Sequence, residues 1–135
     1  MSCVFLDTAG MLALWDDTDQ WHSAATEAHQ RLMTHRGSLW FVSTTFVLLE
    51  CGNAATRRPL RSVVMRLRER LEEADNLIFP TEADWQQAWV VYAGREGNSA
   101  GIVDCVSFVV MRRLGIQQAF TNDEHFRAAG FETLF

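Results

Sequence analysis

The sequence predicts an α/β fold with a central parallel sheet of four to five strands. Short apolar runs at residues 4–6 and 39–42, and a short strand-like segment at residues 116–120, alternate with longer segments whose apolar residues recur at helical spacing. Strands that alternate with helices form a parallel sheet with right-handed crossovers. The chain has 135 residues, 48% of them hydrophobic and 21% charged, which fits a single domain over residues 1–135 with its own core.

The first 42 residues are predicted to form a strand, two helices and a second strand. Residues 4–6 are wholly apolar, which is typical of a strand covered on both faces. A short helix is expected over residues 8–15. A longer helix is expected from about residue 19 to residue 36, where Gly37 ends it. Residues 39–42 predict the second strand.

Two more helices and a third strand are predicted next. Residues 43–45 are Ser, Thr and Thr, which favour a helix N-cap, and this helix is expected to run to about residue 57. Pro59 is well placed to start the following helix, which ends near residue 74. Residues 76–79 predict the third strand, closed by Pro80.

The last part of the chain is predicted to hold two helices and then a strand, a short helix and a strand. The helix that begins near Thr81 carries an apolar stripe, which indicates a face in the core. That stripe consists of Trp85, Ala88, Trp89 and Tyr92. Residues 102–114 are apolar almost all round, so this helix is expected at the centre, ended by Gly115. The remaining elements are expected over residues 116–120, 121–130 and 131–135.

Composition and charge leave two interpretations of the basic residues. The net charge of −5 disfavours a nucleic-acid partner, but all twelve basic residues are arginines, whose planar guanidinium groups suit phosphate. Six of them lie close together: Arg57, Arg58, Arg61, Arg66, Arg68 and Arg70. One interpretation is a solvated helix face paired with Glu69, Glu72 and Glu73. The other is an RNA-binding surface that includes Arg66, Arg68 and Arg70.

Cysteine usage and hydropathy predict a cytoplasmic protein. The three cysteines, Cys3, Cys51 and Cys105, form no C-x-x-C pair, so neither a disulfide framework nor a zinc finger is expected. Cys51 and Cys105 are expected to be small buried hydrophobic residues. Asp7 interrupts the apolar N-terminus, and no apolar run reaches the roughly 18 residues of a membrane span.

Two carboxylates directly follow predicted strands. Asp7 ends the first strand and Asp123 follows the fourth. Ligands of open parallel sheets bind beyond the carboxyl ends of the strands, which is where both acids are expected. Each acid also has a structural alternative. Asp7 suits a helix cap, and Thr121 with Glu124 forms a T-x-x-E capping box that places Asp123 in the first helical turn.

Two further acids lie in apolar surroundings. Glu50 shares a helix face with Phe46 and Val47, so it is expected to be partly buried, which is costly unless the carboxylate is paired or binds a cation. Asp104 stands among apolar residues, with Ser107 on the same helix face. The structural alternatives are a helix edge that reaches solvent for Glu50 and a favourable helix dipole for Asp104.

Taken together, the four acids predict a site for a hard divalent cation. Carboxylates that lie close together repel one another, and a divalent cation is the usual remedy. Carboxylate oxygens without His or Cys ligands favour Mg²⁺ or Mn²⁺. Such ions generate a hydroxide and stabilise charge during phosphoryl displacement, which indicates a nuclease.

Four segments of the sequence resemble the PIN domain family and, more narrowly, the VapC-like toxins of type II toxin–antitoxin pairs. They are FLDTAGML, VLLECGNAA, DCVSFVVMRRLGI and AFTNDEHFRAAGF. The resemblance covers nearly the whole chain, although residues 55–95 carry little signature. It implies a three-layer α/β/α fold and a metal-dependent endoribonuclease. It also implies a homodimer that is silenced by a cognate antitoxin.

The resemblance also implies roles for individual residues. The implied metal ligands are Asp7, Asp104 and Asp123, with Mg²⁺ or Mn²⁺ as the cofactor. Glu50 is expected to position or deprotonate the attacking water, so that RNA is cut to 5′-phosphate and 3′-hydroxyl ends. The residues expected to hydrogen-bond the acids or a phosphate are Thr8, Ser107 and Thr121.

Aromatic residues and His125 carry weaker signals. Trp15 and Trp21 are the expected antitoxin contacts, with core packing as an equal alternative. His125 lies two residues past Asp123, but a histidine in such a place is more often structural or exposed than functional.

Other fold families fit the acids less well. A phosphoryl-accepting receiver domain needs a lysine, and the chain has none. A haloacid-dehalogenase-type phosphatase needs D-x-D-x-T after the first strand, whereas Asp7 is followed by Thr8 and Ala9. A non-catalytic PIN-like module that binds RNA or protein, and a housekeeping RNA-processing nuclease, remain the alternatives.

Overall fold

The chain folds around a sheet of five parallel strands in the order β3-β2-β1-β4-β5. The computed structural model describes residues 2–56, 59–94 and 99–135. The strands are β1 (Ser2–Leu6), β2 (Leu39–Thr44), β3 (Leu77–Ile78), β4 (Gln118–Phe120) and β5 (Glu132–Thr133). The predicted parallel sheet is therefore confirmed, and β1 is its middle strand.

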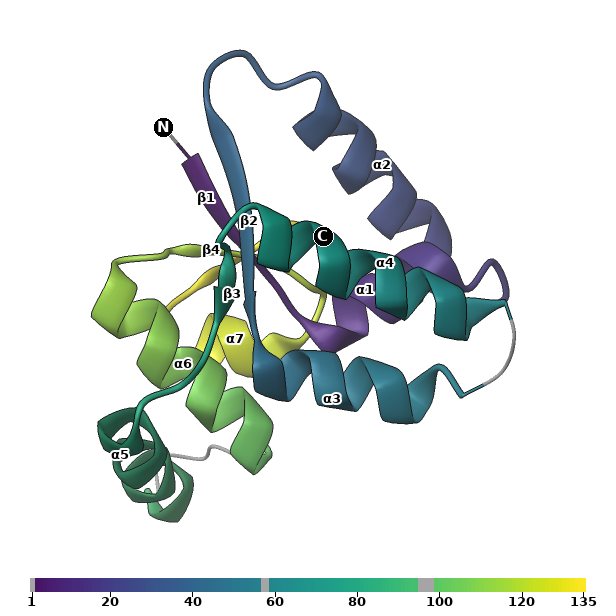
Figure 1. The fold of residues 1–135 in the computed structure, drawn as a ribbon. Coiled ribbons are helices and arrows are strands. Elements are labelled where there is room, and N and C mark those ends of the chain that lie inside the picture. The colour runs from purple at the N-terminus through teal and green to yellow at the C-terminus, as the bar shows by residue number, and fades with distance from the viewer. Residues whose placement is uncertain (1, 57–58, 95–98) are drawn as a thin grey trace.

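Helices cover both faces of this sheet. They are α1 (Thr8–Trp15), α2 (His22–Met33), α3 (Thr45–Ala54), α4 (Leu60–Glu73), α5 (Glu82–Ala93), α6 (Ile102–Leu114) and α7 (Glu124–Ala128). Figure 1 shows α1, α2 and α4 on one side of the sheet and α5 and α6 on the other, which confirms the three-layer α/β/α arrangement. In the described parts of the chain, no helix has the length and apolar character needed to span a membrane.

Two helices are shorter than the sequence predicts. The expected start of α2 near residue 19 is wrong, because the Asp16 and Asp19 side chains accept the backbone N–H groups of Thr18 and Trp21 in turns that precede the helix. The helix ends at Met33, before Gly37 at φ 108°. α3 ends at Ala54 rather than near residue 57, which itself lies outside the described residues.

Caps explain three of the helix ends that match the prediction. The Thr44 hydroxyl accepts the Val47 N–H at the start of α3. At the start of α5, Thr81 and Asp84 form a capping box, each side chain accepting the other's backbone N–H. Gly115 ends α6 in the left-handed conformation at φ 69°, which a glycine adopts without steric cost.

The core lies between β1 and α6. Val4 and Phe5 of β1 are fully buried, and every residue of α6 from Cys105 to Met111 is buried. The predicted central place of α6 is thus confirmed. Burial of large side chains such as Phe108, which contacts Phe126 edge to face, gives this layer its stability.

The predicted core face of α5 is wrong, because three of its four stripe residues are exposed. Trp85, Trp89 and Tyr92 are 43%, 40% and 51% exposed, and of the stripe only Ala88 is buried. α5 is instead held to α6 by close packing at Ala88 and by Arg113, which donates two hydrogen bonds to the nearly buried Asp84 at 2.9 and 2.7 Å. The three exposed rings and the partly buried Phe46 of α3 form an aromatic ladder, defined here as Phe46, Trp85, Trp89 and Tyr92, in edge-to-face contact.

Gly10 fixes how closely the first turn of α1 approaches the end of β4. A Cβ on Gly10 would lie 1.9 Å from the backbone oxygen of Phe120, a distance that no side chain tolerates. The absence of a side chain at Gly10 therefore allows β4 and the turn that follows it to lie directly against α1. Asp7 and Thr121 are the residues on the two sides of this contact.

We expect Gly10→Ala to lower the free energy of unfolding by about 3 kcal/mol or more, since the added methyl group must displace backbone. Gly52→Ala is the matched control, because a Cβ there meets nothing within 4 Å. Gly52 lies on the exposed side of α3, so alanine there is expected to be neutral or to stabilise by up to about 1 kcal/mol. Urea unfolding of both variants measures the difference, and equal effects would contradict the close approach at Gly10.

Candidate active site

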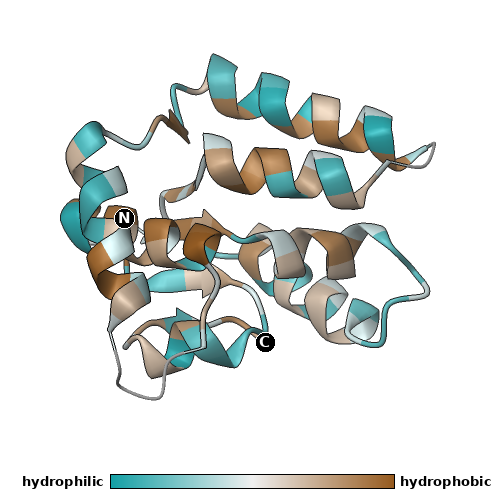
Figure 2. Cartoon of the chain, turned by 90° about the horizontal axis from the view of Figure 1, so that it is seen from below, coloured by the Kyte–Doolittle hydropathy of each residue, from teal (hydrophilic) through white to brown (hydrophobic). Residues whose placement is uncertain are grey.

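Four acids from four elements meet at the carboxyl end of the sheet. Figure 2 views the molecule from this end. The four are Asp7 after β1, Glu50 on α3, Asp104 in the first turn of α6 and Asp123 at the start of α7. The sheet order explains their proximity, because β1 lies between β2, which leads into α3, and β4, which leads into α7. The structure thus brings together all four acids selected from the sequence.

Asp7 is the most deeply buried of the four acids, with 2% of its surface exposed. The Thr121 hydroxyl accepts the Asp123 N–H at 3.1 Å and donates its own proton to Asp7 Oδ2 at 2.9 Å. The other oxygen, Oδ1, is buried and has no hydrogen-bond partner among the described residues. Asp7 occupies the N-cap position of α1, but its side chain does not cap the helix. The cap alternative therefore does not explain this carboxylate.

Glu50 is partly buried, as expected, and is held by one of the predicted supporting residues. The Thr8 hydroxyl donates to Glu50 Oε1 at 2.7 Å. This bond joins the first residue of α1 to the middle of α3, across 42 positions of sequence. Thr8 and Thr121 therefore play equivalent parts, since each hydroxyl occupies one oxygen of an acid.

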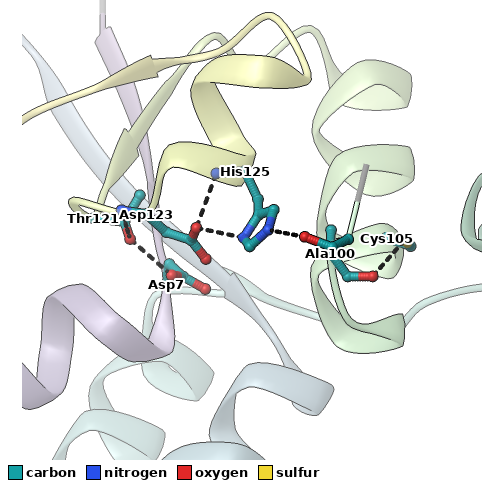
Figure 3. Close-up of polar contacts among 7 residues, drawn as sticks. Asp7, Ala100, Cys105, Thr121, Asp123 and His125 are labelled. Carbon is teal, nitrogen blue, oxygen red and sulfur yellow. Dashed lines mark hydrogen bonds and ion pairs between the residues drawn. The ribbon is translucent and has the colours of Figure 1, made fainter. Parts of the chain in front are cut away.

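The predicted T-x-x-E capping box at α7 is wrong. Asp123, and not Thr121, is the N-cap residue, and its Oδ1 accepts the His125 N–H at 2.9 Å. The same oxygen lies 2.8 Å from His125 Nδ1, as Figure 3 shows. The Thr121 hydroxyl oxygen accepts the N–H of Asp123, which precedes the helix, and α7 begins only at Glu124 with Asp123 as its cap.

Burial and mutual repulsion disturb two of the acids. Burial, followed by the charge of Asp104, raises the pKa of Asp7 to about 7, against the lowering effect of the Thr121 hydrogen bond. Burial, followed by the charges of Asp123 and Glu50, raises the pKa of Asp104 to about 6. Carboxylates with such neighbours are stabilised by a positive charge placed among them.

The donor set fits a divalent cation. Asp104, Asp123 and His125 offer ligand atoms that all lie within 4.8 Å of one another. Asp7 is not part of that group, although its charge interacts with those of Asp104 and Asp123. Asp7 Oδ1, buried and without a partner among the described residues, is the second feature that such a cation would satisfy. The two buried cysteines are unsuited to a soft metal site, since burial raises the pKa of Cys51 to about 12 and also raises that of Cys105.

The other residues selected from the sequence lie in varied places. Ser107 is fully buried and its hydroxyl has no partner among the described residues, so it does not support an acid as Thr8 and Thr121 do.

The three arginines predicted to bind RNA are exposed on α4: Arg66, Arg68 and Arg70. Of these, Arg68 pairs with Glu72 at 2.8 Å. Arg57 and Arg58 lie outside the described residues. Trp15 packs partly buried against the core, and Trp21 is 43% exposed.

Two residues beside the acids were not predicted as part of the site: His125, which was expected to be structural or exposed, and Ser99. His125 Nε2 lies 2.9 Å from the Ser99 hydroxyl, just before α6. The spacing Asp-x-His was the available signal for His125. Nothing in the sequence pointed to Ser99, because its partner lies 26 residues away.

Comparisons with known proteins identify a family and two relatives. The family model described as PIN domain matches residues 4–132. The chain is 31% identical over 129 residues to a protein named 23S rRNA-specific endonuclease VapC20 from Mycobacterium tuberculosis, with 95% of each chain covered. The same named protein from a second strain of that species matches equally well.

Solved structures show the same fold. The crystal structure of Mycobacterium tuberculosis VapC20, titled a Sarcin-Ricin loop cleaving toxin, matches with a TM-score of 0.77 and 26% identity over 95% of each chain. VapBC-1 from nontypeable Haemophilus influenzae matches with a TM-score of 0.66 and 17% identity, covering 97% of this chain and 96% of that one. FitAcB from Neisseria gonorrhoeae gives 0.60 and 17%, covering 96% and 95%.

We expect Asp7→Asn to stabilise the metal-free protein at pH 8. The pKa of Asp7 is raised from 3.8 to about 7. Ionisation of this carboxyl therefore lowers the free energy of unfolding as the pH rises from about 4 to about 7, and the full loss is present above pH 7. Removing the charge is expected to recover on the order of 2–4 kcal/mol at pH 8 and little at pH 4.

The measurement is thermal unfolding with EDTA or Mn²⁺ at pH 4 and pH 8. Mn²⁺ is expected to raise the Tm of the native protein but not that of Asp7→Asn. Asp17→Asn, in an exposed turn, is the control for loss of one negative charge. A lower Tm for Asp7→Asn in EDTA at pH 8 would contradict the electrostatic cost assigned to Asp7.

Proposed function

This chain belongs to the PIN domain family, whose members are nucleases, and we propose that it is a divalent-metal-dependent endoribonuclease acting as the toxin of a VapBC-like pair. The observation that carries this proposal is the meeting of four acids around a buried carboxylate oxygen that no described residue satisfies. A structural role alone does not explain four carboxylates gathered where their charges oppose folding.

Ribosomal RNA is the proposed substrate. The relative with 31% identity is named for cleavage of 23S rRNA, and its solved structure is titled for the sarcin–ricin loop. Both matches extend over 95% of this chain, so they include all the elements that carry the four acids. We therefore assign a structured ribosomal RNA loop as the substrate class.

Asp7, Asp104 and Asp123 are the proposed holders of the cation, and Mg²⁺ or Mn²⁺ suits their oxygens. Such an ion, when bound, neutralises charge at the phosphate and makes a water molecule more acidic. Thr121 leaves Asp7 Oδ1 free for it. Ser107 lies one turn from Asp104, but its hydroxyl is fully buried and touches no acid of the site, so no contact with a phosphate is assigned to it.

Glu50 is the proposed general base. Thr8 donates to Oε1, which fixes the carboxylate and leaves Oε2 to accept a proton from the attacking water. As the water oxygen bonds to phosphorus, the bond from phosphorus to the 3′ oxygen breaks, and that oxygen leaves as an alkoxide that takes up a proton from solvent water to become the 3′-hydroxyl. The products then carry 5′-phosphate and 3′-hydroxyl ends.

An apolar groove on the opposite side of α1 fits an antitoxin segment. Its volume is about 410 Å³, and it lies between α2 and α4 with side chains that include Leu14, Leu32, Leu67 and the half-exposed Met33 and Trp40. An exposed apolar groove of this kind is typical of a surface that binds a partner chain. Trp15 and Trp21, at the adjoining ends of α1 and α2, keep their proposed role as contacts beside it.

Arginines border the same groove. Arg70 is one of its lining residues, and Arg66 and Arg68 lie on the same helix. These three remain the proposed RNA contacts, since exposed guanidinium groups bind phosphate well. Their position next to the groove would let a bound antitoxin compete with RNA for this helix.

The aromatic ladder is the proposed contact with a second copy of the chain. The part of α5 that carries its rings, residues 85–92, has no charged side chain. An uncharged aromatic face on a protein with a net charge of −5 is typical of a protein–protein interface. A homodimer would cover the rings that the core does not.

Cleavage of ribosomal RNA by the purified, antitoxin-free protein tests the proposal. We expect cleavage with Mg²⁺ or Mn²⁺, none with EDTA, and a loss of about 100-fold or more in Asp104→Asn, which removes one charged cation ligand. Asp17→Asn keeps the same net charge as Asp104→Asn and is expected to cleave normally.

The chemistry of the cut ends completes this test. A 5′-phosphate is expected on the downstream fragment. That fragment should therefore be a direct substrate for ligation, and a kinase should label its 5′ end only after a phosphatase has removed the phosphate. A 2′,3′-cyclic phosphate would contradict attack by water. Cleavage that survives both EDTA and Asp104→Asn would contradict the role of the acids.

A further inference from the structure

Three of the four acids of the site, Asp7, Glu50 and Asp123, have one oxygen held by a donor among the described residues and one oxygen left open. Thr121 holds Asp7 Oδ2, and Thr8 holds Glu50 Oε1. The corresponding donor for Asp123 is His125, which supplies both hydrogen bonds to Oδ1, from its backbone N–H at 2.9 Å and from Nδ1 at 2.8 Å. Among the described residues, no donor reaches Asp123 Oδ2, so this oxygen is the one left for a cation.

The ring of His125 is held on its other side as well. A carboxylate oxygen only accepts hydrogen bonds, so Nδ1 carries the proton and Nε2 of the neutral ring accepts from the Ser99 hydroxyl at 2.9 Å. Figure 3 shows the ring lying between Asp123 and the segment that enters α6. Ser99 lies two residues before Gly101, the N-cap of α6. The ring therefore joins the start of α7 to the segment that leads into Asp104.

This placement sets the geometry between two acids. Asp104 and Asp123 come from different helices, and the ligand atoms of both lie within 4.8 Å of those of His125. Asp123 is partly exposed and repelled by Asp104, so without a second tether its carboxylate would be free to rotate away. Replacing a residue that hydrogen-bonds a metal ligand typically lowers the metal affinity by about 10–100-fold.

We propose that His125 is a positioning residue that holds Asp123 Oδ1 and so presents Oδ2 to the cation, with Ser99 fixing the plane of the ring. This inference rests on the proposed function only in taking Asp104 and Asp123 as cation ligands. It does not depend on which RNA is cleaved, or on whether RNA is cleaved at all. His125 is 38% exposed, so its replacement removes little core packing.

The test is calorimetric titration of Mn²⁺ into the purified protein and three variants of His125. Asparagine places an amide N–H at the position of Nδ1, whereas glutamine places one at the position of Nε2. Alanine removes both. We expect about 10–100-fold weaker Mn²⁺ binding in His125→Ala and His125→Gln, and binding within about threefold of the native protein in His125→Asn.

Two further variants define the alternatives. Ser99→Ala is expected to weaken binding only about two- to threefold, because the bond to Asp123 remains. His35→Ala, on an exposed residue outside the site, is expected to change nothing. Unfolding of each variant in EDTA checks that the fold is kept, since all of them retain the backbone N–H bond to Asp123.

Each outcome decides the proposal. Rescue by asparagine but not by glutamine supports positioning through Nδ1. Equal losses of Mn²⁺ affinity in His125→Ala and His125→Asn would overturn the proposal and make His125 a direct ligand. Native affinity in His125→Ala would also overturn it. So would the absence of Mn²⁺ binding by the native protein. A native protein that binds Mn²⁺ with the expected variant order but does not cut RNA would refute only the proposed activity.

Discussion

Repulsion between a buried carboxylate and its partly buried neighbours is the constraint on which the rest of the structure depends. Asp7 stands at the end of the middle strand with 2% of its surface exposed, and the charges of Asp104 and Asp123 act on it through a poorly solvated interior. Two neighbouring strands and two helices are arranged so that these charges meet. A fold selected for stability alone would separate them or replace them by apolar groups.

The supporting contacts keep this costly arrangement in one geometry. The Thr121 hydroxyl ties the end of β1 to the turn after β4, and Thr8 ties α1 to α3. Gly10 lets the first turn of α1 lie against the backbone of Phe120, which brings the partners of the first contact together. Each of these residues acts on the position of an acid. Local sequence, packing and site chemistry are therefore coupled at the carboxyl end of the sheet.

Much of this arrangement was predictable because short-range signals were strong. Apolar runs and caps located β1, α1 and α6, and acids in apolar settings identified Asp7, Glu50, Asp104 and Asp123. The failures arose where tertiary contacts prevailed over local pattern. Thr121 donates its hydroxyl proton to a residue 114 positions away, which no local rule anticipates, and Asp123 rather than Thr121 caps α7.

The aromatic stripe of α5 shows a different limit. Helical spacing correctly placed Trp85, Trp89 and Tyr92 on one face, but periodicity does not reveal whether a face meets the core or a partner. Arg113 and Asp84 turn α5 so that Ala88 meets α6 and the rings face outward. A pairing between residues 29 positions apart decided which side was buried.

Counting the protons released when a cation binds is the most direct test of the central claim. Because the pKa of Asp7 is about 7 and that of Asp104 about 6, the metal-free site holds about one proton near pH 6.5, which a bound cation must expel. Calorimetric titration of Mn²⁺ in buffers of different ionisation enthalpy measures this number. We predict about one proton released per ion at pH 6.5, falling towards zero by pH 8.5. Binding without proton release at pH 6.5 would contradict a cation held between Asp7 and Asp104.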